Sequence, residues 1–239
     1  MIIVTTLYNA GEYVEKCIGS LMGQTYNDFK CYITDDISTD NSVALVKAMI
    51  QGDDRFVLIE NKTKLYQSGN YDQVIRNNPD IDDNEIIVEV DGDDWLPDGK
   101  TLQRIYDVYS DDNVWIANGC FKYSDGSMGF SSRQENIDNL RFERFTASHI
   151  RTWRAFLWRN IKEEDLKDDD GIYWTVSGDV AFMFPMLEMS GPEHYVFMNT
   201  VNYVYNGENP YNDHKVNMNI VNVIADKIRR KEKYNKLIR

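Results

Sequence analysis

The most chemically suggestive part of the chain is an acidic turn, Asp91-Gly92-Asp93-Asp94, which Trp95 follows. Two carboxylates separated by one small residue can face a single ion, and hard cations such as Mg²⁺ and Mn²⁺ favour oxygen ligands. Gly92 carries no side chain that would block the close approach of a ligand. A cation bound here would neutralise the charge that builds on a departing diphosphate. The turn therefore predicts metal-assisted chemistry on a phosphorylated ligand.

Other interpretations of this turn are open. Asp is a favoured turn and cap residue, so an acidic strand-to-helix turn without any ligand also accounts for it. A calcium-binding EF-hand loop that begins at Asp91 would need a bidentate Glu where the chain has Leu102, which excludes it. A phosphatase with an aspartate nucleophile would need Thr or Val where Trp95 stands, so it is a weak alternative.

Strand-like and helix-like segments alternate through the first half of the chain and would position this turn. Strands are expected at residues 2–6, 29–34, 56–60, 85–90 and 114–118. Helices are expected between them. Asn9 caps the first, with Glu12 completing a capping box, and Asp40 caps the second, which runs from 41 to about 50. A third is expected over 69–77 and a fourth after Asp98. This alternation predicts an α/β fold with a mostly parallel sheet covered by helices on both faces.

Polar residues follow the ends of three of these strands. Residues 6–9 follow the first strand, Asp35 and Asp36 follow the second, and the acidic turn follows the fourth. Ligands of such sheets bind beyond the carboxyl ends of the strands. The three clusters are therefore expected to converge on one edge of the sheet.

The second half is less regular. We expect a hairpin at 121–130 and a loop-like stretch at 131–148. A helix capped by Ser177 should end near residue 189, and two strands should follow at 195–198 and 201–205. One long helix with a basic outer face is expected from about 216 to the end. The chain shows no internal repeat and no low-complexity linker, so residues 1–239 are expected to form a single domain.

Composition narrows the class of protein. The chain has 239 residues, 42% of them hydrophobic, enough for one well-packed α/β domain. A net charge of −13 argues against a nucleic-acid partner, although it allows a nucleotide whose phosphates are bridged by a divalent cation. No apolar run approaches the ~20 residues of a membrane-spanning helix, and the N-terminus lacks the features of a signal peptide. The expected location is the cytoplasm, and the three cysteines are expected to be reduced core thiols.

Four motifs in order carry a resemblance to the family 2 glycosyltransferases of the GT-A fold, over nearly the whole chain. Residues 4–9 resemble the first strand of the family with its Tyr-Asn turn, and residues 20–26 resemble its Ser-Leu-x-x-Gln-Thr-Tyr run. Residues 34–40 resemble its Asp-Asp-Gly-Ser-Thr-Asp signature, and residues 91–96 resemble its Asp-x-Asp-Asp-Trp-Leu motif. The resemblance implies a GT-A-like (Rossmann-like) fold and the transfer of a sugar from a nucleotide diphosphate sugar. Residues 1–119 would bind the nucleotide sugar, 120–215 would form the acceptor side, and 216–239 would be the basic helix.

The resemblance also implies roles for the nucleotide-binding residues. Thr6, Tyr8 and Asp36 match positions that hold the base, and the Asp36 carboxylate would accept a hydrogen bond from uracil N3–H, which favours a UDP-sugar. Guanine also offers donors to a carboxylate. Ile37 stands where the family usually has Gly, so the turn after Asp36 is where this chain departs from the family.

The same resemblance implies a metal site and a base. Asp91, with Gly92, matches the position near the ribose and the metal, and Asp93 matches the principal ligand of Mn²⁺ or Mg²⁺. His214 is a further ligand candidate, although a loop His is more often solvated; His149 and His194 are weaker candidates. The predicted base of an inverting transfer is Asp179, at the start of a late helix where Gly178 replaces the Glu of the family; a carboxylate that only stabilises the helix dipole is the alternative.

The acceptor side is the least informative part of the sequence. A hydroxyl acceptor on a glycan, a lipid or a protein is expected. Arginines and tryptophans of the second half could contact the diphosphate or stack on a sugar, or serve only packing: Arg141, Arg144, Arg151, Arg154, Arg159, Trp153 and Trp158. The basic C-terminal helix could touch anionic lipid or simply be solvated.

Two functions of other classes compete with glycosyl transfer. A nucleotidyltransferase on sugar nucleotides would want a Gly-rich loop with a basic residue after the first strand, and residues 7–12 contain only Gly11 and no Lys or Arg. A non-catalytic sugar-nucleotide or glycan-binding module is the second alternative. It predicts that donor binding survives the loss of the Asp179 carboxylate and that neither form turns over.

Overall fold

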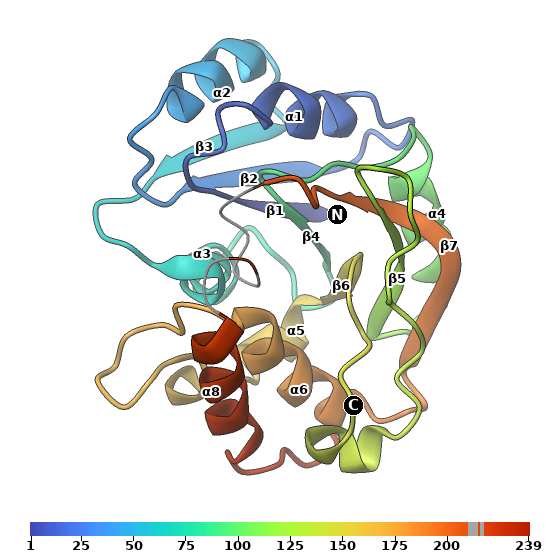
Figure 1. Cartoon of the computed structure of the whole chain (residues 1–239). Coiled ribbons are helices and arrows are strands. Elements are labelled where there is room, and N and C mark those ends of the chain that lie inside the picture. Colours follow the sequence, from blue (N-terminus) through green and yellow to red (C-terminus); the bar gives the residue numbers. More distant parts are fainter. Residues whose placement is uncertain (210–214, 216–217) are drawn as a thin grey trace.

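A single seven-stranded sheet in the order β3-β2-β1-β4-β6-β5-β7 organises the molecule (Figure 1). The structure is a computed structural model that describes residues 1–209, 215 and 218–239. The strands are β1 (Ile2–Leu7), β2 (Lys30–Asp35), β3 (Phe56–Glu60), β4 (Ile86–Asp91), β5 (Ile116–Tyr123), β6 (Arg151–Arg154) and β7 (Tyr195–Tyr205).

The sheet is mixed but mostly parallel, which confirms the predicted GT-A-like α/β fold. Strands β3, β2, β1 and β4 pair in parallel, and β5 pairs in parallel with β7. Strand β6 lies between β4 and β5 and runs antiparallel to both. The near-continuous apolar sequence of β1 is typical of a parallel strand that is buried on both faces.

Helices cover both faces of the sheet (Figure 1). The helices α1 (Val14–Met22), α2 (Ser42–Ile50) and α4 (Thr101–Val108) pack on one face. The other face carries α3 (Tyr66–Ile75), α5 (Ala155–Arg159), α6 (Gly178–Ser190) and α8 (Met218–Arg229). Side chains of β1 alternate between the faces: Ile3 packs toward α1 and α2, while Ile2 and Val4 pack toward α3 and α6.

Three predictions about element ends are wrong. Helix α1 begins at Val14, so Asn9 and Glu12 do not form a capping box; instead Asn9 Oδ1 accepts a hydrogen bond from the backbone N–H of Thr39 at 2.8 Å. The two late strands are one strand, β7, which keeps its pairing with β5 through two register shifts. The C-terminal helix ends at Arg229, and residues 231–239 continue without helical structure.

Helix α6 is the central helix of its layer. Every residue except Asp179 is buried, because the helix packs on α3, α5 and α8 at once. Ser177 holds the predicted N-cap position, but with φ of 57° its hydroxyl donates to the carbonyl of Val221 instead of capping the helix. Among the described residues, no helix is long and apolar enough to cross a bilayer.

Candidate functional site

The carboxyl ends of β1, β2 and β4 meet as the sequence predicts. Thr6 lies between Thr34 of β2 and Asp91 of β4 in the register of the sheet, and its hydroxyl donates to Asp91 Oδ1 at 3.3 Å. Next to it, the backbone N–H of Asp36 donates to the carbonyl of Leu7 at 2.8 Å. The three polar clusters therefore share one edge of the sheet.

Gly92 is required by the packing of the turn itself. A Cβ at this position would lie 2.7 Å from both Leu7 Cδ1 and the carbonyl oxygen of Thr6. The Gly92 N–H donates to that same Thr6 carbonyl at 2.8 Å, which draws the turn against β1. Any larger residue would push the turn away from the end of β1, and Asp91 and Asp93 would move with it.

Five carboxylates gather at this edge, and we call them the acidic corner: Glu89, Asp91, Asp93, Asp94 and Asp179. Within the described part of the chain, the ion pairs to these groups come from one guanidinium. Arg151 Nη1 binds Glu89 Oε1 at 2.5 Å and its Nη2 binds Asp179 Oδ2 at 2.7 Å. The corner therefore carries an excess of negative charge.

Burial and mutual repulsion make the ionised forms of the carboxylates in the acidic corner unfavourable. Burial raises the pKa of Asp91 well above its usual range, and the carboxylates of Glu89 and Asp93 raise it further. Burial also raises the pKa of Asp94 well above normal, followed by the charges of Asp93 and Asp91. The pKa of Glu89 rises through burial although Arg151 opposes the shift. A bound cation would relieve this repulsion.

The two remaining aspartates of the turn have different partners. Asp94 is buried, and its Oδ1 accepts a 2.6 Å hydrogen bond from the backbone N–H of Asn206, which ties the turn to the end of β7. Asp93 is half-buried, and its Oδ2 accepts a 2.6 Å hydrogen bond from Asn209 Nδ2. Asp93 thus lies on the outer side of the corner, next to the segment that leads to His214, which is outside the described residues.

Asp36 is buried and already holds the start of α3. Its Oδ1 accepts from the backbone N–H of Leu65 at 2.8 Å and its Oδ2 accepts from that of Tyr66 at 2.9 Å. Lys64 places its ammonium 3.5 Å from Asp36 Oδ2 and 2.9 Å from the ring centroid of Tyr8, which is itself exposed. The predicted base-binding residues Tyr8 and Asp36 therefore lie side by side with a lysine between them.

Ile37, which stands where the family usually has glycine, lies in the turn after Asp36. Ile37 has φ of 67°, in the left-handed region that glycine enters freely and that a β-branched residue enters at a cost. The turn after Asp36 therefore carries backbone strain at Ile37.

Asp179 extends from the first turn of α6 toward the acidic corner and is 29% exposed. Gly178 precedes it, and a Cβ there would lie 3.1 Å from Gln67 Oε1, so the position that carries Glu in the family is pressed against α3. Gln67 in turn donates to Glu89 Oε1 at 3.1 Å and to Asp91 Oδ1 at 3.4 Å. The predicted base and the predicted metal ligand thus border one site.

The structure adds Gln67 and Glu89, which the sequence analysis did not name, and brings in His149 and Arg151, which the sequence analysis named only as weaker or unspecific candidates. Glu89 carried the clearest signal, because it is an acid flanked by Val88 and Val90 in the middle of strand β4. Arg151 was one of five candidate arginines. The others bind elsewhere: Arg141 pairs with Glu188, for example, and Arg154 with backbone carbonyls. Trp153 and Trp158 are fully buried, which rules out sugar stacking and confirms packing roles.

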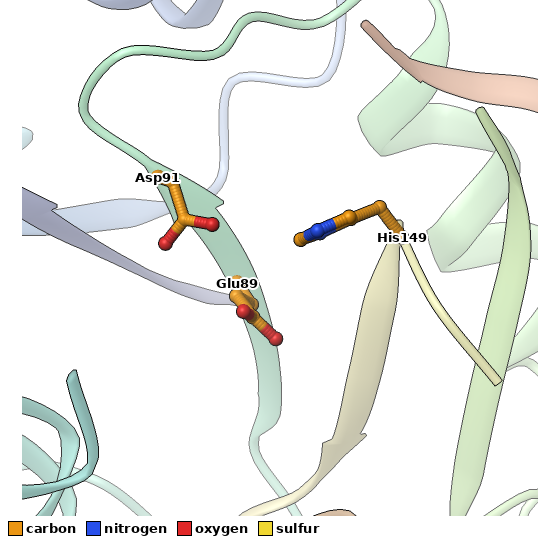
Figure 2. Close-up of side chains that lie close together, drawn as sticks. All are labelled: Glu89, Asp91 and His149. Atoms are coloured by element: carbon orange, nitrogen blue, oxygen red, sulfur yellow. The ribbon is translucent and has the colours of Figure 1, made fainter. Parts of the chain in front are cut away.

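His149 completes the inner wall of the corner (Figure 2). It is buried, it stacks on Tyr203 with 4.5 Å between ring centroids, and burial followed by the charge of Arg151 lowers its pKa well below the usual range. The imidazole is therefore neutral and can offer a lone pair to a metal ion. His194 lies elsewhere, stacked on Trp115 with its Nδ1 against the carbonyl of Asn113.

Comparison with known proteins agrees with the fold and the motifs. Residues 2–175 match the family Glycosyl transferase family 2, and the chain belongs to this family. Glycosyltransferase GlyG of Streptococcus pneumoniae is 27% identical over 130 residues, which cover 54% of this chain and 42% of GlyG.

Solved structures show the same architecture. The 1–349 fragment of Staphylococcus aureus TarS in complex with UDP superposes with a TM-score of 0.65 at 15% identity, covering 86% of this chain and 60% of that one. The mannosyltransferase PcManGT from Pyrobaculum calidifontis, in complex with GDP-Man and Mn²⁺, superposes with a TM-score of 0.60 at 15% identity, covering 98% and 65%. This chain thus spans less than two thirds of these relatives, and at this identity the likeness to the two structures shows the fold.

Proposed function

We propose that this chain transfers a sugar from a nucleotide diphosphate sugar, with UDP-sugars favoured, to a hydroxyl acceptor, by inversion and with a divalent cation. The observation that carries the proposal is the shared site at the sheet edge, where Thr6 and Asp91 on the donor side border Asp179 on the acceptor side through Gln67 and Arg151. Membership of the family and the UDP complex of the TarS fragment support the nucleotide sugar as donor.

The donor base would lie over Tyr8, next to Thr6 and Asp36. Asp36 already accepts three hydrogen bonds, from the backbone N–H groups of Leu65 and Tyr66 and from Asn61 Nδ2. A carboxylate has about four lone-pair sites, so one can still accept from uracil N3–H. Lys64 lies over the Tyr8 ring and would have to move aside or bind the donor as well. Its ammonium offers a positive charge to an anionic ligand in an otherwise acidic region.

The corner fits a divalent cation, Mn²⁺ or Mg²⁺. Its carboxylates outnumber the paired guanidinium, and Glu89 Oε2 and Asp94 Oδ2 are buried without a hydrogen-bond partner among the described residues. Asp91 and Asp93, together with the predicted ligand His214, would hold the ion next to the donor. Such an ion would neutralise the negative charge that builds on the departing diphosphate.

Asp179 is proposed as the base. Its carboxylate would take the proton of the acceptor hydroxyl while that oxygen attacks the anomeric carbon and the bond to the diphosphate oxygen breaks. Arg151 holds Asp179 Oδ2 and directs the carboxylate toward the corner. The other oxygen, Oδ1, binds only the adjacent backbone N–H of Val180 in the described structure, and so retains lone-pair capacity for a substrate proton.

The partners on the acceptor side belong to the same proposal. A glycan, lipid-linked or protein-linked hydroxyl is the acceptor class, and the location is the cytoplasm. The C-terminal basic helix, α8, is the proposed point of peripheral contact with the anionic face of the membrane. Support for lipid contact comes from the exposed apolar side chains Met218 and Val223 on α8.

Thermal unfolding with UDP, GDP and dTDP tests the donor site, each with Mn²⁺ and with a chelator. A ligand at 100 times its Kd should stabilise the chain by about 2.7 kcal/mol. We expect the largest shift with UDP and Mn²⁺, and its loss in Asp93→Ala. A larger shift with GDP would transfer the proposal to a GDP-sugar. No shift with any nucleotide would refute the donor assignment.

A further inference from the structure

The inner side of the acidic corner holds a group of metal-binding side chains that differs from the predicted one. Glu89 and Asp91 of β4 and His149, just before β6, each offer a ligand atom, and these atoms lie within 4.8 Å of one another. Figure 2 shows the imidazole of His149 directed toward the two carboxylates. Among the described residues no other group of three such side chains comes this close.

Two atoms of this group are buried without a partner. Glu89 Oε2 and His149 Nδ1 have no hydrogen bond in the described part of the chain, although the side chains are 0% and 6% exposed. Buried polar atoms are almost always satisfied, so two unsatisfied atoms on side chains whose ligand atoms lie within 4.8 Å of each other point to a missing ligand. A cation between them would satisfy the Glu89 oxygen and a lone pair of the imidazole together.

Neighbouring side chains hold both ligands in place. Arg151 occupies Glu89 Oε1 and leaves Oε2 free, and stacking on Tyr203 fixes the plane of the His149 ring. The antiparallel register of β4 and β6, with Val88 opposite Thr152, sets the two strands side by side here. Such outer contacts commonly orient metal ligands.

We propose that Glu89, Asp91 and His149 bind a divalent transition-metal ion in the nucleotide-free protein. Two carboxylates and one imidazole suit Mn²⁺, Co²⁺ or Zn²⁺ better than Mg²⁺ or Ca²⁺, which prefer oxygen ligands alone. Ligand distances of about 2.1 Å require the three side chains to draw together slightly. Asp91, which is half-buried, gives the ion its route from solvent and shares it with the donor. In this last respect the inference rests on the proposed function.

The site can be observed directly because the chain contains only three histidines. The full chain, labelled with ¹⁵N-histidine and free of nucleotide, is titrated with Zn²⁺ and then with paramagnetic Co²⁺ while the imidazole signals are followed by NMR. We expect the His149 signals to shift with Zn²⁺ and to show the largest paramagnetic effect of Co²⁺. Signals of His149 that stay unchanged at saturating metal would overturn the proposal.

Two matched variants add an affinity measurement. His149→Phe keeps an aromatic ring on Tyr203 but removes the ligand atom, and His194→Phe makes the same change where the ring stacks on Trp115. Calorimetric titration with Mn²⁺ should show affinity at least tenfold lower in His149→Phe and unchanged in His194→Phe. Glu89→Gln should weaken binding in the same way. Equal Mn²⁺ affinity in the wild type and in folded His149→Phe and Glu89→Gln would also overturn the proposal.

The two proposals fail in different ways. Metal binding that depends on His149, without any nucleotide shift, would refute the donor site and leave this metal site in place. Stabilisation by UDP that requires Mn²⁺ and Asp93, together with a Mn²⁺ affinity of the nucleotide-free protein that His149→Phe leaves unchanged, would support the donor site and refute this metal site.

Discussion

Asp94 and Asp179 show how surroundings separate two carboxylates of one site. Asp94 is buried beneath the turn, where it binds one backbone N–H of the segment after β7. Asp179 is partly exposed, and its negative charge is balanced by Arg151. Asp94 is therefore suited to hold the turn, and Asp179 is suited to meet a substrate.

Replacing the proposed base should separate binding from turnover. We expect Asp179→Asn to lower kcat about 10²–10⁴-fold, because proton removal from the acceptor is lost, while Mn²⁺-dependent UDP binding persists. The measurement is UDP release in the presence of acceptor, alongside UDP binding by calorimetry. If Asp179 only stabilised the dipole of α6, the variant would lose a fraction of a kcal/mol of stability and keep its kcat. Binding without turnover in the wild type as well would indicate a non-catalytic module.

At the scale of elements, α3 links the nucleotide side to the acceptor side. Its start is held by Asp36, its first turn supplies Gln67 to the acidic corner, and its later residues pack on α6. Tyr71 of α3 lies in an aromatic cluster with Trp153, Trp158 and Phe182, so the helix is fixed by packing as well as by the hydrogen bonds to Asp36 at its start.

The hydrogen bonds between Asp36 and the start of α3 give a prediction with an internal control. Asp36→Ala should cost about 1–2 kcal/mol, because two backbone N–H groups lose their acceptor, and should also abolish the UDP-dependent shift. Asp40→Ala removes a similar pair of hydrogen bonds, to Ser42 and Gly11, at the start of α2. We expect that variant to lose comparable stability in urea unfolding yet to keep UDP binding. Equal loss of UDP binding in both would mean that Asp36 acts through stability alone.

At the scale of the whole molecule, charge should control stability. The net charge is −13. Part of this charge belongs to the carboxylates of Asp91 and Asp94 in the acidic corner, whose pKa values are raised. A carboxyl group whose pKa is higher in the folded state than in the unfolded one stabilises the fold at low pH. That contribution is lost as pH rises from the unfolded value through the folded one. His149, with a lowered pKa, acts in the opposite direction below its ordinary value of 6.5.

Asp94→Asn isolates one carboxylate from these opposing effects. Asn keeps an acceptor for the backbone N–H of Asn206 but carries no charge to bury. In a chelator, we expect the variant to be more stable than the wild type at pH 8, by on the order of 1–3 kcal/mol. The advantage should shrink as pH falls toward the ordinary pKa of Asp and should also shrink when Mn²⁺ is present. Urea unfolding of both proteins across this pH range, with and without Mn²⁺, measures the difference in their free energies of unfolding. A difference that does not change with pH would contradict the conclusion that burial raises the pKa of Asp94.

The sequence by itself determined the alternating elements, the strand ends and the acidic turn, because these depend on local patterns. It predicted β3 at its exact bounds and placed the ends of β1, β2 and β4 within one residue of the structure. The convergence of Thr6, Asp36 and Asp91 followed from a general property of parallel sheets. The Asn9 cap failed because a contact across the chain, to Thr39, outcompeted the local one. The division of the chain into donor, acceptor and basic parts remains a prediction.

Only the tertiary structure decided what surrounds the carboxylates. Strand β6 inserts antiparallel between β4 and β5, a long-range pairing that no local pattern encodes. That insertion brings Arg151 to Glu89, 62 positions away, and His149 to Asp91. The chemistry of the corner depends on which side chains face the same buried space, and pairing between distant strands sets that arrangement.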